Sequence, residues 1–212
     1  MEAVKKEVIF DETGTYKYSL LCKWSEVNER KLTFILSFPE NTYEYSDDTA
    51  VSKCIELAQK WGFGVLEIVY LFSYQTDHVS FLRMLSKEEA VGTRTGEYIQ
   101  KAVEDAELVV VAWGDHGSIY NRQEEVERFL KHKPVYCFGK TKQQFPRHIL
   151  SVVHRTELQK YEMPANREES EEVSSFIEDI DQSFGGEDYS PIKQLTEEEP
   201  LMFIEDIASM YR

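Results

Sequence analysis

The chain has 212 residues, 42% of them hydrophobic and 13% aromatic, so it is long and apolar enough to fold around its own core. Its formal net charge of -15 disfavours loose adhesion to nucleic acid or to an anionic membrane surface. No apolar run approaches the ~20 residues of a membrane span, and the N-terminal segment lacks the apolar core of a secretory signal. Three well-separated cysteines indicate neither a disulfide framework nor a zinc site, so we expect a cytoplasmic protein without metal or other cofactors.

The acidity is concentrated at the C-terminal end of the chain. Residues 1–155 carry 20 basic and 23 acidic side chains, whereas residues 156–212 carry 4 and 16. We therefore expect a nearly neutral folded domain over residues 1–155, followed by an acidic tail over residues 156–212.

Strand-like apolar segments alternate with amphipathic helical segments before the tail. The first predicted helix begins after a cap at Asp47 or Asp48 and ends at Gly62. Two further helices are predicted over residues 96–106 and 122–132. The first strand alternates apolar and polar residues, which predicts one exposed face, whereas the third is apolar enough to be buried on both faces. In chain order, the predicted strands cover residues 16–22, 31–37, 65–72, 108–113 and 135–138.

This alternation predicts a three-layer α/β/α domain with a mainly parallel sheet. In such sheets the ligand site lies beyond the carboxyl ends of the strands. The loops that we expect at that edge are residues 37–46, 73–78, 114–121 and 139–148.

The tail contains two acidic amphipathic stripes separated by a break at Gly185 and Gly186. We expect residues 168–212 to bind a protein partner or to form a homo-oligomer, while docking of the first stripe on the chain's own core is an equally good interpretation. The apolar positions are Val173, Phe176, Ile177 and Ile180 in the first stripe, and Leu201, Ile204, Ala208 and Tyr211 in the second.

Short motifs at the predicted edge carry candidate chemistry. Residues 113–117 end a buried strand and place His116 where it could exchange a proton, although a plain strand-to-helix turn explains them too. Residues 139–142, Gly-Lys-Thr-Lys, lack the leading glycine and following helix of a Walker phosphate loop. A phosphate contact and a solvated turn are both consistent with Lys140, Lys142, Arg147 and His148. The pair at residues 47–48 is a helix cap or a paired-carboxylate site.

Several motifs recur together in an order that points to a known family. They are Tyr18-Ser19-Leu20, Phe34-Ile35-Leu36 with Pro39, Asp47-Asp48, Cys54, Trp61-Gly62-Phe63-Gly64, Leu71-Phe72, Ala112-Trp113-Gly114 with His116-Gly117, Gly139 with Thr141-Lys142, and Pro146-Arg147-His148. This order resembles the bacterial and phage family known as domain of unknown function 1643. The resemblance covers about residues 16–150 and implies no settled biochemical activity.

The chain is more distantly similar to uracil-DNA glycosylases. These enzymes have a parallel α/β sheet, an Asn-Pro or Asp-Pro loop after a strand, a strand that ends in Trp-Gly, and a late His-Pro loop. Their first loop positions the attacking water, and their late histidine stabilises the departing base. The resemblance implies candidate catalytic residues His116, Arg147 and His148. It also implies a nucleotide or base pocket lined by Phe38, Pro39, Tyr70, Trp113, Gly114, Phe145, Lys140 and Lys142.

Three positions depart from the usual pattern of the domain of unknown function 1643 family. Phe38 replaces an asparagine of the first loop, Phe145 replaces a histidine of the late loop, and Tyr70 replaces an asparagine. Phenylalanine cannot orient water or donate a hydrogen bond. We therefore expect a non-catalytic or catalytically altered binding protein, which acts through its acidic tail and through a nucleotide or base pocket. The alternatives are an active glycosylase-like enzyme on nucleic acid or nucleotides, and an acidic mimic of nucleic acid.

Overall fold

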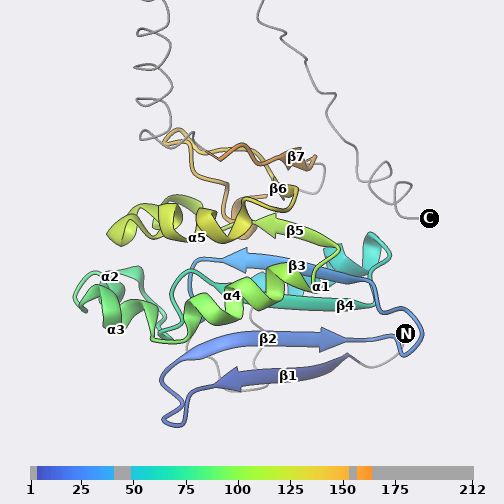
Figure 1. The fold of residues 1–212 in the computed structure, drawn as a ribbon, viewed down its shortest axis with the longest axis horizontal. Coiled ribbons are helices and arrows are strands. Elements are labelled where there is room, and N and C mark those ends of the chain that lie inside the picture. The colour runs from blue at the N-terminus through green and yellow to red at the C-terminus, as the bar shows by residue number, and fades with distance from the viewer. Residues whose placement is uncertain (1–3, 41–48, 153–156, 164–212) are drawn as a thin grey trace, which may run out of the picture. The chain divides into compact units, whose positions relative to one another are not determined.

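The computed structural model describes residues 4–40, 49–152 and 157–163, and the part of it up to Tyr161 belongs to one compact unit. Its strands form one sheet in the order β1-β2-β4-β3-β5-β6-β7 (Figure 1). The strands are β1 Lys5–Phe10, β2 Lys17–Lys23, β3 Lys31–Leu36, β4 Val65–Tyr70, β5 Leu108–Val111, β6 Val135–Cys137 and β7 Gln159–Lys160. The helices are α1 Thr49–Lys60, α2 Val79–Leu82, α3 Lys87–Val91, α4 Thr95–Glu104 and α5 Arg122–Leu130, with 3-10 segments η1 Gly114–Asn121 and η2 Ile149–Ser151.

The sheet is mixed. Its central strands β4, β3, β5 and β6 run parallel to one another. At its flanks β2 is antiparallel to β4, β1 is antiparallel to β2, and β7 is antiparallel to β6. The predicted α/β class is therefore confirmed, whereas the predicted mainly parallel sheet is correct for the centre and wrong at the flanks.

Strand β2 is more buried than its alternating sequence indicates. Every residue from Lys17 to Leu20 is buried, so the predicted exposed face does not exist. The ring of Tyr18 stacks on that of Tyr98 from α4, with 5.0 Å between the ring centroids. The hydroxyl of Ser19 donates to the Glu67 carboxylate at 2.6 Å, which satisfies the polar side chain inside the fold.

Strand β7 lies beyond residue 155, where the sequence predicted the start of the tail. It pairs with β6 through Tyr136 and Lys160, and the next residue, Tyr161, is buried and donates its backbone N–H to Val135 at 2.7 Å. The folded sheet therefore includes residues that composition alone assigns to the acidic tail.

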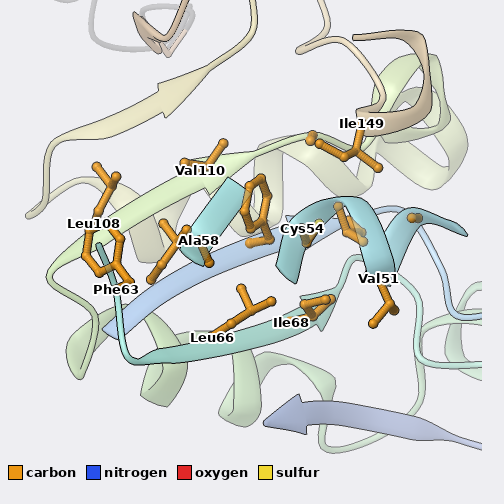
Figure 2. Packing of buried hydrophobic residues seen from close by; sticks show 14 of the residues in the cluster. Val51, Cys54, Ala58, Phe63, Leu66, Ile68, Leu108, Val110 and Ile149 are labelled. Carbon is orange, nitrogen blue, oxygen red and sulfur yellow. The ribbon is translucent and has the colours of Figure 1, made fainter. Parts of the chain in front are cut away.

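The main hydrophobic cluster lies between α1 and the sheet (Figure 2). Val51, Cys54 and Ala58 recur at helical spacing and pack onto β3, β4 and β5. The ring of Phe34 in β3 stacks with those of Trp61 and Phe138, each at 6.4 Å. Each such side chain contributes about 1.5–3 kcal/mol of burial free energy, so this cluster supplies a large part of the driving force for folding.

The opposite side of the sheet is covered by α4 and α5 and also contains buried polar groups. Thr33 in β3 donates its hydroxyl to the carbonyl oxygen of Ala102 in α4 at 3.0 Å. Lys31 pairs with Glu67 at 2.5 Å across β3 and β4. The Thr33 hydrogen bond attaches α4 to the sheet, and the Lys31–Glu67 pair joins two strands beneath it.

Some of the predictions concern residues outside the described ranges. They are the acidic pair Asp47 and Asp48, the two apolar stripes of the tail, and the proposed protein-binding segment at 168–212. Within the described ranges, the helices are all too short or too polar to cross a bilayer. Cys22, Cys54 and Cys137 are buried and form no disulfide.

Candidate functional site

The loops that follow the parallel strands meet at the carboxyl edge of the sheet, as the sequence predicts. Strands β3 and β5 point to the same side of the molecule, where α2 also lies (Figure 1). The backbone N–H of Thr76, after β4, donates to the carbonyl oxygen of Pro39, after β3, at 3.1 Å. The first two loops are thus joined directly.

Two hydrogen bonds join η1, after β5, to the late loop after β6. The backbone N–H of Gly114 donates to the carbonyl oxygen of Pro146 at 2.9 Å, and the Thr141 hydroxyl donates to the Asp115 carboxylate at 2.5 Å. Gly114 has a φ of +66°, and a Cβ at this position would lie 3.1 Å from the Cβ of His148. Glycine is therefore required here by both conformation and space.

Three rings from three different loops lie next to one another at this edge. The ring centroids of Phe38 and His116 are 5.4 Å apart, and those of His116 and His148 are 6.2 Å apart. All three side chains are only partly buried. We call Phe38, His116 and His148 the ring cluster.

Trp113 and Phe145 lie beside the ring cluster and are separated by Gly117. The indole of Trp113 is fully buried and donates its Nε1–H to the side-chain oxygen of Gln123 at 3.1 Å. A Cβ on Gly117 would lie 2.7 Å from Trp113 Nε1 and 3.1 Å from Phe145 Cδ1. The second glycine of this motif therefore lets the late loop close onto the indole.

The two histidines of the ring cluster differ in their surroundings. Burial and the nearby charge of Arg83 lower the pKa of His116, so its imidazole is neutral at physiological pH, and its buried Nδ1 has no hydrogen-bond partner among the described residues. His148 Nδ1 accepts the backbone N–H of Leu150 at 3.3 Å. In neutral His148 the proton is therefore on Nε2.

Other predicted site residues lie outside the ring cluster. Tyr70 belongs to the hydrophobic cluster, and the ammonium of Lys17 lies 6.0 Å from its ring centroid. Lys140 is directed at Tyr161, with 5.4 Å from its ammonium to the ring centroid. Arg147 is exposed and donates its Nε–H to the Lys140 carbonyl oxygen at 3.4 Å, and Lys142 is exposed.

No sequence motif marks the segment that supports η1. Tyr120 donates its hydroxyl to the carbonyl oxygens of Leu82 and Leu85, at 3.1 and 2.5 Å, and so attaches η1 to α2 and to the residues after it. Tyr120 and Asn121 both have positive φ, +55° and +53°. Two consecutive left-handed residues that are not glycine are uncommon, and only the asparagine is a recognisable candidate for that conformation.

Among the described residues, the edge is close to electrically balanced. Its loops and the end of α2 carry the cations Arg83, Lys140, Lys142 and Arg147 and the carboxylates Glu40, Asp77 and Asp115. A strongly basic cleft would favour an enzyme on nucleic acid. The described residues also contain no group of three or more side chains suited to hold a metal ion.

A family model with the description "Protein of unknown function (DUF1643)" matches residues 17–150. The chain belongs to this family. This match confirms the resemblance seen in the motifs. The more distant resemblance to uracil-DNA glycosylases is not shown by it. Neither the curated proteins nor the solved structures contain a match to the chain. The function must therefore be argued from the site.

Proposed function

We propose that this protein is a non-catalytic or catalytically altered member of its family that binds a nucleobase or nucleotide at the ring cluster. The arrangement of Phe38, His116 and His148 carries this proposal. Partly exposed aromatic faces stack on planar heterocycles, and a base also offers the donors and acceptors that imidazole nitrogens need. The imidazoles of His116 and His148 are the groups to which the donors and acceptors of such a ligand would bond.

The residues around the ring cluster favour binding over turnover. Phe38 occupies the first-loop position where a polar side chain would orient an attacking water, and phenylalanine has no group for that task. Asp115 already accepts a hydrogen bond from Thr141. Phe145 packs beside Gly117 and Trp113 and has no proton to give or take.

An enzyme acting on nucleic acid or nucleotides is the second candidate, and one observation favours it. The lowered pKa of His116 makes its imidazole a competent proton acceptor at neutral pH, and His148 lies next to it. Arg147, the third candidate catalytic residue, lies on the same late loop but outside the ring cluster. Release of a base from uracil-containing DNA, abolished in His116→Ala or His148→Ala, would establish this alternative.

Calorimetric titration of the full chain with the common nucleoside monophosphates tests the binding proposal. We expect at least one of them to bind, and Phe38→Ala to weaken that binding about 5- to 150-fold, because one stacked base contributes about 1–3 kcal/mol. Val27→Ala is the control, since Val27 is 94% exposed in the turn before β3, away from the carboxyl edge. Equal affinity in Phe38→Ala, or no binding at millimolar nucleotide, would contradict the proposal.

A further inference from the structure

Three large exposed apolar side chains lie on segments that contact η1 or the ring cluster. Among the described residues, the exposed large hydrophobic side chains are Val27, Phe81, Met84 and Leu150. Phe81 is 53% exposed in α2, Met84 is 80% exposed just after α2, and Leu150 is 45% exposed in η2. We call Phe81, Met84 and Leu150 the edge patch.

Contacts to the ring cluster and to η1 place the edge patch at the carboxyl edge. Tyr120 of η1 holds the carbonyl oxygens of Leu82 and Leu85, which flank Met84. Arg83, between Phe81 and Met84, is close enough to His116 to lower its pKa. Leu150 donates its backbone N–H to His148 at 3.3 Å. The exposed apolar side chains therefore come from segments on both sides of the histidine pair.

The composition of the edge patch is that of a protein-docking surface. Phenylalanine and methionine are enriched at protein interfaces, and methionine adapts its shape to a partner. Exposed cations accompany them: Arg83 lies within the patch, and Lys142 and Arg147 lie on the late loop. A partner with apolar and acidic side chains in alternation would match both features.

We propose that the edge patch binds the acidic C-terminal segment, residues 168–212, of a second copy of this chain. The 49 residues after Met163 contain 14 acidic and 3 basic side chains, with apolar residues spaced between the acidic ones. Their apolar side chains would pack on the edge patch while their carboxylates meet the exposed cations. A segment of this length reaches well beyond its own domain, because an extended chain spans about 3.3 Å per residue.

Nucleic acid is the competing occupant, and the apolar character of the edge patch disfavours it. Both occupants are anionic, but the acidic segment of a second copy also brings apolar side chains that can pack on Phe81 and Met84, whereas a phosphate backbone offers none. The proposal goes beyond nucleotide binding at the ring cluster and does not depend on it.

Sedimentation equilibrium of the full chain over a range of concentrations tests the proposal. We expect reversible self-association that weakens at high salt, because screening reduces the contribution of the charges. The variant Phe81→Ser/Met84→Ser should weaken association at least ~10-fold, or about 1.4 kcal/mol. Val27→Ser, which removes an equally exposed apolar side chain elsewhere, should associate like the wild type.

Charge reversal provides a second variant that leaves the apolar side chains intact. Arg83→Glu should weaken association at low salt. High salt should partly restore association of this variant, because it screens the repulsion between the introduced glutamate and the acidic segment. The circular dichroism spectrum should be unchanged. A wild-type chain that remains monomeric at several hundred micromolar, or variants that associate like the wild type, would overturn the proposal. The proposal would also be overturned if the wild type stayed monomeric and bound a single-stranded oligonucleotide that the edge-patch variant no longer bound. Nucleotide titration of the same variants reports separately on the ring cluster.

Discussion

The two faces of the sheet are stabilised in different ways. On the side of α1, a hydrophobic cluster surrounds Phe34, and its contacts are non-directional. On the side of α4 and α5, buried polar side chains make specific hydrogen bonds: Gln123 holds Trp113 at the end of β5, and Arg122 holds the carbonyl oxygen of Leu71 after β4 at 2.9 Å.

This difference separates stability from the placement of the loops. Hydrophobic burial depends on the area removed from water, whereas a hydrogen bond defines a distance and a direction. The α1 side therefore contributes mainly non-directional stability. The α4 and α5 side determines where the loops that carry His116 and Phe38 lie.

The largest expected effect is on the α1 side. Phe34→Ala removes a ring that is fully buried between Trp61 and Phe138, and it should lower the free energy of unfolding by about 3–5 kcal/mol in a urea titration. Phe81→Ala removes the same group from an exposed position and should change stability by less than about 0.5 kcal/mol. Comparable losses in the two variants would contradict the account of the core.

The next effect concerns the contact beneath the ring cluster. Gly117→Ala places a methyl group against the indole of Trp113 and against Phe145, so we expect a loss of about 1–3 kcal/mol and a changed fluorescence of Trp113. Gly96→Ala in α4 meets only Phe129 at 3.4 Å and should be stabilising by up to about 1 kcal/mol, since alanine favours helix. If Gly117→Ala were also stabilising, the close packing of the late loop on Trp113 would be wrong.

A smaller effect is expected for the buried guanidinium of Arg122. Arg122→Met fills the same space but leaves the Leu71 carbonyl oxygen without its donor, at a net cost of about 1 kcal/mol. Glu125 keeps its ion pair with Lys87, so no buried charge is left alone. Arg94→Met, which breaks an exposed pair with Glu97, is the control and should cost less than about 0.5 kcal/mol. Of these two variants, only Arg122→Met should bind nucleotide more weakly than the wild type.

The smallest expected effects are pH-dependent and of opposite sign for two glutamates of α5. Burial raises the pKa of Glu127 despite a hydrogen bond from Tyr161, so the native state loses stability as the pH rises from 4.5 towards the raised pKa. Burial also acts on Glu125, but Lys87 and Arg122 outweigh it and lower its pKa. The stabilisation by Glu125 is present above pH 4.5 and is lost as the pH falls through its lowered pKa.

Thermal melting across this pH range separates the two glutamates. Glu127→Gln should remove the loss of stability at higher pH, and Glu125→Gln should remove the loss in acid. The same pH profile in both variants would contradict the assigned surroundings. Glu127→Gln retains a group that can accept the hydrogen bond from the Tyr161 hydroxyl, so β7 should remain paired.

Much of the central fold could be predicted from local sequence. The buried strand over residues 65–72 and the Val-rich strand over residues 108–113 are apolar runs of the right length, and both correspond to observed strands. Strand β1 was missed because its first residues, Lys5 and Lys6, are charged, and only pairing with β2 makes it a strand. Strand β7 has two residues, too few for any periodic signal.

The site was predictable as a location but not as a geometry. The rule that loops meet at the carboxyl edge brought Phe38, His116 and His148 to one place. It could not separate Tyr70, which is packed in the core, from the residues of the ring cluster. Nor could it identify Arg83. Burial, together with the charge of Arg83, lowers the pKa of His116. Arg83 lies in the segment that the Tyr120 hydroxyl attaches to η1 through the carbonyl oxygen of Leu82.

The measurement that tests the central claim most directly is a titration of the ¹⁵N-labelled histidine side chains with nucleotide. The account predicts that the resonances of His116 and His148 shift in a saturable way, and that Phe38→Ala raises the nucleotide concentration needed for half of each shift about 5- to 150-fold. His132 is exposed just after the end of α5 and should not respond. Unchanged resonances at saturating nucleotide, or a response of His132 as large as that of His116, would contradict a base-binding site at the ring cluster.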